Sequence, residues 1–409
     1  MSSTHSLMEV FGEDVTGSGV ALKNKSLKKD IINQLDEDGD LTIADLSREL
    51  NISTPKITSL VNELIDEGLL QDLGKIDSTG GRRASIYGLV NDACYFIGVD
   101  VKRYYINIGL LDFKKHLVSV HEKIPYPLEN TQQSLAALID TIRNFIKEQG
   151  IAKDKILGIG INLSGRVNNI TGYSYSYFHF HEEPLVATIE QELGIKTFLE
   201  NDSNAMAYGE FAHGVVTNEK NVLFINLDYG TGSGIIVDGK VYYGKSGFSG
   251  EFGHIPFYDN EIICGCGKKG CLETEVSGQA LLRKVKEKME AGAATILSKN
   301  KNELKLEDLI EAAKQEDVLM IELLAEMGEK LGRALAVLIN LFNPELVILG
   351  GTLAETGDYL RLPARSALNK YSLSLVNNDT QVKLSKLGEK AGVMGGCLIA
   401  RNKVLGKMH

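Results

Sequence analysis

Apolar residues recur at helical spacing in three short segments near the amino terminus of the chain. Apolar positions three or four residues apart form the buried stripe of a helix. The pattern predicts helices over residues 26–35, 43–50 and 54–67. A short break joins the second helix to the third, so the two form a helix-turn-helix whose second helix can enter a DNA major groove.

Two β-rich runs follow the third predicted helix, at residues 69–74 and 83–89. They predict the hairpin of a wing. Its tip, residues 78–83, combines two glycines with two arginines, which can reach a phosphate backbone or a narrow minor groove. We therefore predict a winged helix-turn-helix domain over residues 23–90. Residues 1–22 lack apolar periodicity and contain three glycines, which predicts a flexible arm.

The outward face of the third predicted helix carries short polar or basic side chains, which can donate hydrogen bonds to bases or phosphates. The alternative is that this small domain only mediates protein contacts. The predicted DNA-contacting residues of the helix and the wing are Thr54, Lys56, Thr58, Ser59, Asn62, Arg82 and Arg83.

The remainder of the chain shows an order of β-rich runs and helices that occurs twice. In the first half, three runs within 95–124 precede a helix and a buried run at 156–163. In the second half, runs within 222–243 precede helices and a buried run at 346–351. This repeat predicts a two-lobed α/β domain. The domain covers residues 91–409, with lobe one at about 91–205 plus the C-terminal helix and lobe two at about 206–385.

Composition and charge narrow the choice of protein class. The chain has 409 residues, of which 43% are hydrophobic and 24% charged, and this is typical of globular domains. No segment has the ~18 uninterrupted apolar residues of a membrane helix, and residues 1–20 do not resemble a secretion signal, so we expect a cytoplasmic protein. The net charge of −10 excludes a broad basic surface, so any DNA contact comes from a local patch.

Three of the five cysteines are crowded into one segment that follows a histidine. One imidazole and three thiols are a complete set of tetrahedral zinc ligands, and the interleaved glycines allow a tight loop. The alternative is three ordinary cysteines near a histidine. Because the protein would fill all four positions, we expect a structural zinc ion. The predicted ligands are His254, Cys264, Cys266 and Cys271.

Together these motifs resemble the ROK family of bacterial sugar kinases and sugar-responsive repressors, and specifically its NagC/XylR-like repressor branch. The resemblance covers about residues 25–405 and implies a two-lobed actin/hexokinase-like (ribonuclease H-like) fold with the sugar in the cleft. The resemblance rests on the winged helix with its Gly-Gly-Arg-Arg wing and on the segments 163–167, 200–205, 251–254 and 264–273.

The resemblance implies that Asn201, Asp202, Glu251, His254 and Glu273 bind sugar hydroxyls. Carboxylates and amides suit this task because each can engage adjacent hydroxyls. His254 would bind zinc through one ring nitrogen and donate to the sugar through the other. Asp202 occupies the position of the general base in the family's kinases. The alternative is that Asn201 and Asp202 only cap the helix that follows them.

An ATP-dependent sugar kinase, of the glucose or N-acetylhexosamine type, is the main alternative function. Kinases of the family resemble Asp-x-Gly-Gly-Thr-Lys in their first phosphate loop, whereas here Val101, Lys102, Arg103 and Tyr104 follow Asp100. Side chains at these positions obstruct the close backbone approach that phosphates need, so we expect no catalytic residues. Glycine-bearing turns at 228–234 and 350–352 could still bind phosphate through their backbone amides. The turn at 163–165 lacks the proline that is usual in the family.

The sequence thus predicts a sugar-responsive transcriptional repressor of carbohydrate-utilisation genes. We expect it to bind double-stranded operator DNA as a homodimer or homotetramer and to be released by a sugar or sugar phosphate. N-acetylglucosamine 6-phosphate, glucose and xylose all remain open as effectors. A third function, a sugar sensor that acts through a transport-protein partner, also remains open.

Overall fold

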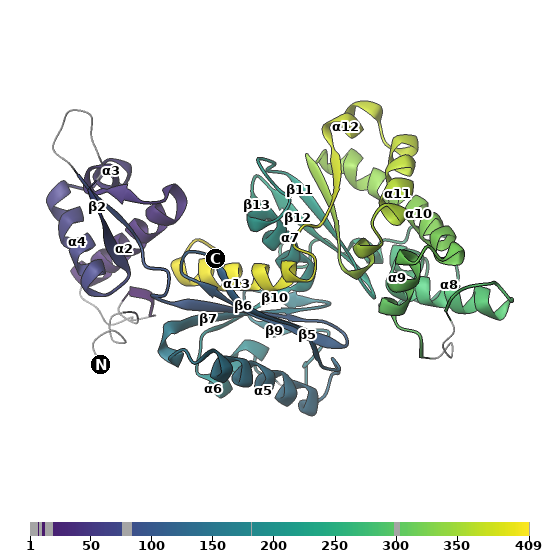
Figure 1. Ribbon diagram of the computed structural model, residues 1–409, viewed down its shortest axis with the longest axis horizontal. Helices are drawn as coiled ribbons and strands as arrows, with labels where there is room; N and C mark the ends of the chain where they lie inside the picture. Colours follow the sequence, from purple (N-terminus) through teal and green to yellow (C-terminus); the bar gives the residue numbers. More distant parts are fainter. Residues whose placement is uncertain are drawn as a thin grey trace.

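The computed structural model describes residues 7, 10–12, 19–75, 84–180, 182–297 and 303–408. Figure 1 shows a winged helix domain, a first α/β lobe and a second α/β lobe, arranged in this order. The predicted wing tip with Arg82 and Arg83 lies outside the described residues. Within those residues, no helix has the length and apolar character needed to cross a membrane.

The amino-terminal domain is a winged helix-turn-helix, as predicted. The Thr42 hydroxyl accepts a hydrogen bond from the Asp45 backbone N–H, and the Asp45 carboxylate accepts one from the Thr42 N–H. This reciprocal pair satisfies two free donors and fixes the start of α3. The strand order is β1-β3-β2. The elements are α2 (Gly19–Asp38), β1 (Leu41–Thr42), α3 (Ile43–Glu49), α4 (Thr54–Asp66), β2 (Leu70–Lys75) and β3 (Ser85–Leu89).

The flexible arm predicted for residues 1–22 differs from the structure at several positions. Helix α2 already begins at Gly19, seven residues before the predicted start. Leu7 and Val10 are buried, and the ring of Phe11 contacts that of Phe113 edge-on at 6.2 Å. The sequence pattern missed this packing because it joins a few apolar residues to a strand end that is distant in the sequence.

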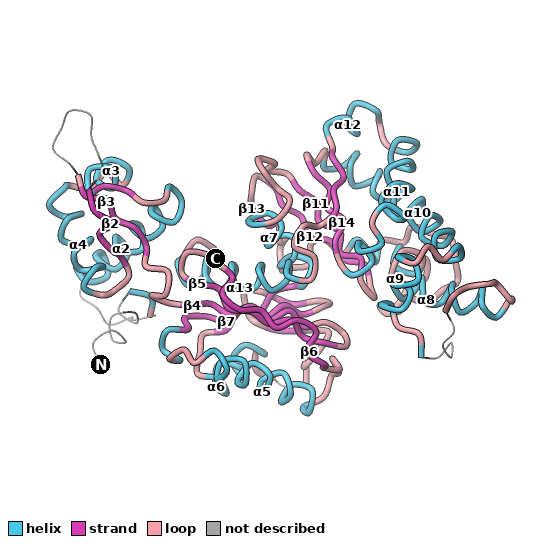
Figure 2. Tube along the Cα trace, viewed as in Figure 1, coloured by secondary structure: helices cyan, strands magenta, loops and turns pink. Residues whose placement is uncertain are grey.

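Lobe one is built on a five-stranded sheet with the order β10-β7-β4-β5-β6. Strand β7 pairs parallel with β4 and β10, whereas β5 pairs antiparallel with β4 and β6. Helices α5 and α6 cover one face of this sheet, and α13 lies on the other (Figures 1 and 2). The elements are β4 (Tyr95–Val101), β5 (Tyr105–Asp112), β6 (Leu117–Pro125), α5 (Gln132–Gln149), β7 (Ile156–Leu163), β8 (Val167–Asn168), β9 (Tyr173–Ser174), α6 (Leu185–Leu193), β10 (Thr197–Asn201) and α13 (Lys390–Leu405).

Lobe two repeats this arrangement with the strand order β13-β12-β11-β14-β15. Its first three strands are antiparallel and its last two pair parallel, as in lobe one. The repeat therefore agrees with the predicted hexokinase-like architecture. The elements are α7 (Asp202–His213), β11 (Val222–Leu227), β12 (Thr231–Val237), β13 (Lys240–Val241), α8 (Gly278–Glu290), α9 (Leu306–Lys314), α10 (Val318–Phe342), β14 (Leu346–Gly350), α11 (Asp358–Tyr371), α12 (Ser374–Asp379) and β15 (Gln381–Leu384).

Helices α7 and α13 pack against each other between the two sheets. Helix α7 follows the last strand of lobe one but packs on β11 and β12, and α13 follows the last strand of lobe two but packs on β4 and β7. A side chain at Gly395 would collide with the carbonyl oxygen of Ala205 on α7. Glycine therefore permits the close approach of these helices.

Replacing Gly395 by alanine is expected to lower the free energy of unfolding by about 1–3 kcal/mol, the usual cost of overpacking a tight contact. The matched control is Gly19→Ala, because no atom of the described residues lies within 4 Å of a side chain added there. Urea unfolding followed by circular dichroism measures both. Equal stability of the two variants would contradict the tight packing of α7 on α13.

A buried ionic junction joins the winged helix domain to lobe one. Asp36, near the end of α2, accepts two hydrogen bonds from the Arg401 guanidinium of α13, at 2.7 and 3.1 Å. The ammonium groups of Lys115 and Lys407 each lie 2.9 Å from the same carboxylate. Arg401 is fully buried and also donates to the carbonyl oxygen of Phe113. The carboxylate of Asp36 thus contacts three cationic side chains that lie outside the winged helix domain.

Candidate metal centre and inter-lobe cavity

A cavity of about 130 Å³ lies between the two lobes. Its walls come from the end of β7, the start of α7, the turn before β12 and the segment around His254. All five residues predicted to bind sugar line it. The lining residues are Ser164, Gly165, Asn201, Asp202, Ser203, Asn226, Asp228, Gly230, Thr231, Gly232, Ser233, Ser249, Gly250, Glu251, His254 and Glu273.

Asn201 and Asp202 lie at the start of α7, so the capping alternative also describes them in part. The Asn201 side-chain oxygen accepts from the N–H groups of Ser203 and Asn204, at 2.9 and 3.2 Å. Asp202 accepts from the Ser203 N–H at 2.8 Å and from the Asn226 amide at 3.4 Å. Burial raises the pKa of Asp202 above its ordinary value. Both side chains are therefore positioned by the helix start at the cavity wall.

The four predicted metal ligands form one cluster in which all the ligand atoms lie within 4.8 Å of one another. His254 Nδ1 is 3.4 Å from Cys264 Sγ, and the sulfur atoms of Cys266 and Cys271 are 3.6 Å apart. For metal–sulfur bonds of about 2.3 Å, the edge of a tetrahedron is about 3.8 Å. The cluster could thus hold a tetrahedral metal ion.

A tight loop shapes this cluster. The Cys264 N–H donates to the Lys268 carbonyl, and the Gly267 N–H donates to the Cys264 carbonyl, both at 2.8 Å. Gly267 has φ +83°, which favours glycine. With Nδ1 facing the thiols, His254 turns its Nε2 toward Glu251, whose carboxylate lies 3.7 Å away. The cluster therefore places the His254 ring between the thiols and the Glu251 carboxylate of the cavity wall.

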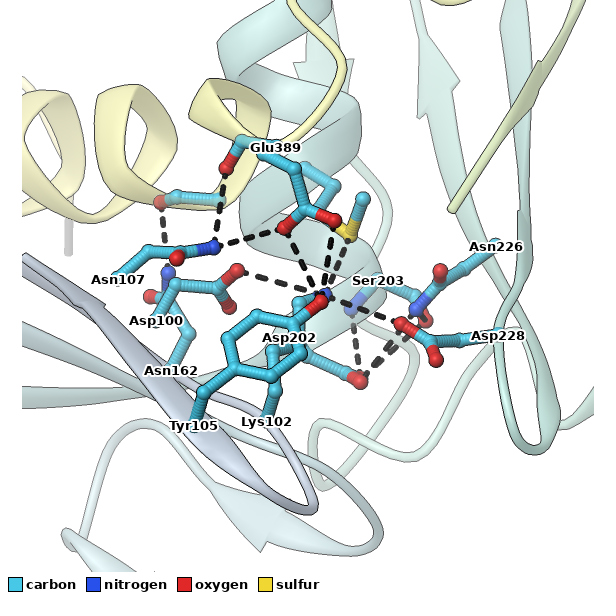
Figure 3. A network of polar contacts seen from close by, with 12 residues as sticks. Asp100, Lys102, Tyr105, Asn107, Asn162, Asp202, Ser203, Asn226, Asp228 and Glu389 are labelled. Atoms are coloured by element: carbon cyan, nitrogen blue, oxygen red, sulfur yellow. Dashed lines mark hydrogen bonds and ion pairs between the residues drawn. The ribbon is translucent and has the colours of Figure 1, made fainter. Parts of the chain in front are cut away.

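Lys102 is a buried cation at the base of the cleft, and the sequence did not predict its position (Figure 3). Its ammonium group lies 3.3 Å from Asp100 of lobe one and 3.6 Å from Asp228 of lobe two. Burial acts to lower the pKa of Lys102, but these carboxylates and Asp202 hold it well above the ordinary value. Burial raises the pKa of Asp100 to about 6. Lys102 thus links the lobes through opposite charges.

The turn at 228–234 was expected to have backbone amides available for phosphate. Instead, the Tyr229 N–H donates to the Asp228 carboxylate at 2.8 Å, and the Thr231 N–H donates to Glu273 at 3.0 Å. The chain's own carboxylates occupy these donors. Asp228 was not among the predicted site residues, although an aspartate that directly follows a buried strand was a signal for it.

The predicted DNA-reading face of α4 is solvent-facing at Thr54, Ser59 and Asn62. The Lys56 ammonium donates to Asn24 of α2 at 2.8 Å, and the Thr58 hydroxyl donates to the Thr54 carbonyl at 2.8 Å. The hydroxyl groups of Thr54 and Ser59 also have partners, Ser47 at 3.3 Å and Glu63 at 3.2 Å. The two wing arginines lie outside the described residues.

Both parts of the chain match models of known protein families. The family model described as ROK family matches residues 96–403, and a model described as winged helix-turn-helix DNA-binding matches residues 25–71. The xylose repressor of Caldicellulosiruptor bescii is 29% identical over 354 residues, which cover 86% of this chain and 89% of that protein.

Solved structures of two kinds are similar to the chain. One is a ROK family transcriptional regulator described as a homologue of the E. coli MLC protein, with 27% identity and a TM-score of 0.77 over 93% of this chain and 97% of that chain. The other is a ROK family glucokinase from Streptomyces griseus in complex with glucose and AMPPNP, with 30% identity and a TM-score of 0.67 over 75% of this chain and 99% of that chain.

Proposed function

The chain belongs to the ROK family, and we propose that it is a sugar-responsive transcriptional repressor of carbohydrate-utilisation genes. The observation that carries this proposal is the buried junction through which a winged helix domain contacts the helix that also reaches the cleft. The similarity to a ROK family transcriptional regulator covers 93% of the chain, more than the two lobes alone. The operator DNA would be bound in the cytoplasm.

Helix α13 is the proposed connection between the sugar and the DNA. Near its start, the carbonyl of Gly392 accepts from Asn162 at 2.7 Å, and Gly392 lies against Asp100 at the base of the cleft. Near its end, Arg401 binds Asp36 of the winged helix domain. A sugar that changes the distance between the lobes would therefore shift the DNA-binding domain, together with lobe one, relative to lobe two. Such a sugar must bind the two arrangements with different affinities.

We propose that the chain is not a sugar kinase. Lys102 stands where kinases of the family have the first glycine of their phosphate loop, and its ammonium group is bound by carboxylates from both lobes. The N–H groups of Tyr229 and Thr231, in the turn at 228–234, are also bound by carboxylates. Phosphoryl transfer needs hydrogen-bond donors and positive charge around the transferred group. On this side of the cleft, the chain's own carboxylates already bind these N–H donors and the ammonium group.

Zinc is the metal that we propose for the cluster of His254 and the three cysteines, because thiolates and imidazole at tetrahedral spacing suit it. When bound, zinc would fix the loop and the orientation of His254 rather than take part in a reaction. We further propose a homodimer or homotetramer, because two winged helices related by a twofold axis read a palindromic operator.

Operator binding tests the proposed function. Fluorescence anisotropy with promoter fragments of sugar-utilisation genes should show binding that weakens with salt and is reversed by a sugar. Replacing Arg82 and Arg83 together by alanine should weaken binding and reduce the slope of log K against log salt by about 2, because two phosphate contacts are lost.

The matched control is Lys370→Ala, because this exposed lysine lies on α11 of lobe two, far from the winged helix domain in the sequence. It should leave the salt dependence unchanged. Sugar-dependent formation of ADP by the same preparation, without operator binding, would favour the kinase alternative and contradict the repressor.

A further inference from the structure

We propose that the cleft accepts an uncharged monosaccharide and rejects the phosphate ester of that sugar. This inference rests on the proposed function, in which a sugar bound in the cleft is the effector. It goes beyond that function because it chooses between the two chemical classes of effector that the sequence left open.

The charges of the cavity wall disfavour phosphate. Among the described residues, four carboxylates line the cavity, those of Asp202, Asp228, Glu251 and Glu273, and no lysine or arginine does. A phosphate ester brings a charge of about −1.5 to −2 at neutral pH. Within a partly buried cleft, like charges repel more strongly than in bulk water. Sugar hydroxyls, by contrast, donate hydrogen bonds that carboxylates accept.

Three of the backbone donors around the cavity are already bonded within the chain. Phosphate sites in proteins use free N–H groups at helix starts and glycine turns. At the start of α7, the Ser203 and Asn204 N–H groups donate to the side chain of Asn201. In the turn before β12, the Thr231 N–H donates to Glu273. A phosphate would therefore have to displace these partners before it could bind to these three N–H groups.

Lys102, the cation at the base of the cleft, is also unavailable to an ester. It is 8% exposed and does not belong to the cavity wall. Its ammonium group faces Asp100 and Asp228 (Figure 3). It also contacts the sulfur of Met206 at 3.5 Å. One cation shared between two carboxylates has no net positive charge left to attract a third anion.

The packing at the base of the cleft leads to the same conclusion. An ester adds a bulky tetrahedral group to the sugar. The base of the cleft beyond Asp202 is filled by Lys102 and its partners, so the added group has no free space on that side of the described structure.

Calorimetric titration of the full chain with matched pairs tests the inference. The pairs are glucose with glucose 6-phosphate, xylose with xylose 5-phosphate, and N-acetylglucosamine with its 6-phosphate. We expect the sugar that binds to bind at least about 100-fold more tightly than its ester. An ester that binds as tightly as its sugar, or more tightly, overturns the inference and leaves the repressor function intact.

A charge variant supplies the second arm of the test. Asp228→Asn removes one carboxylate from the cavity wall and releases Lys102 from one partner. The ratio of the affinity for the sugar to the affinity for its ester should therefore fall by about tenfold. Asp238→Asn is the matched control, because Asp238 is exposed and is not part of the cavity wall. An unchanged preference in Asp228→Asn counts against the inference. If no sugar or ester binds and none releases the operator, the proposed function itself fails.

Discussion

Replacing Asp36 by asparagine should lower the free energy of unfolding by about 3–5 kcal/mol, the usual cost of removing one partner of a buried ion pair. Arg401 is fully buried, and in the variant its guanidinium would lose its carboxylate partner. Thermal unfolding followed by circular dichroism measures the loss. The variant should also bind operator without a response to sugar, because the junction between α13 and the winged helix domain is weakened.

Glu37→Gln is the control for this variant. Glu37 is the neighbouring acid and also pairs with Lys407, at 3.0 Å, but its side chain is 65% exposed. Exposed pairs contribute about 0–1 kcal/mol, so this change should be nearly neutral. Equal stability losses in the two variants would show that the buried junction stabilises the fold no more than an exposed ion pair does.

The pH dependence follows from the sign of the pKa shift. Burial acts to raise the pKa of Asp36, but Arg401, Lys407 and Lys115 hold it below its ordinary range. A depressed pKa contributes stability that is complete above the unfolded-state value, near 3.9, and is lost as the pH falls through the lower folded-state value. The difference between the wild type and Asp36→Asn should therefore stay constant from about pH 5 to 8 and shrink only below about pH 4.

The fold was largely predictable because its signals are local. The buried strand at 156–163 was predicted at the residues where the structure has β7, and the three β-rich runs predicted within 95–124 are β4, β5 and β6. Strand β7 is mainly apolar, as expected for a strand covered on both faces. The third helix of the DNA-binding domain was likewise defined by a proline in its first turn and a regular apolar stripe.

Contacts between distant segments could not be predicted in this way. Asp36 directly follows the helix predicted over residues 26–35, and nothing near it in the sequence indicates Arg401, 365 residues later. Lys102 was recognised as an obstruction, but its two carboxylate partners lie on different lobes. Such pairs depend on how the lobes meet, and a one-dimensional pattern carries no information about that.

The cluster of metal ligands could be predicted from the sequence only in part. Its ligands were predicted from spacing, because three cysteines and a histidine in a glycine-rich segment are the donor set of a tetrahedral metal site. Their relation to the cavity was implied only by family resemblance. The structure adds a direct contact, since Glu273 lies 3.3 Å from Cys264 Sγ and also accepts from the turn before β12.

Loss of the metal should weaken sugar binding. Cys271→Ser removes a fully buried ligand and should lower the zinc content, measured by mass spectrometry, from about one ion per chain to near zero. Without the ion, His254 and the loop that carries Glu273 are no longer held at the cavity, so sugar affinity should fall by at least about tenfold, within the range seen when supporting groups of a metal site are lost.

Cys94→Ser is the matched control, because Cys94 is also fully buried but lies at the start of lobe one, outside the metal cluster. It should cost some stability and leave zinc content and sugar affinity unchanged. If Cys271→Ser kept its sugar affinity while losing zinc, the metal would stabilise the loop without shaping the sugar site. All four ligands of the cluster lie in lobe two, so operator binding by Cys271→Ser should persist and become insensitive to sugar.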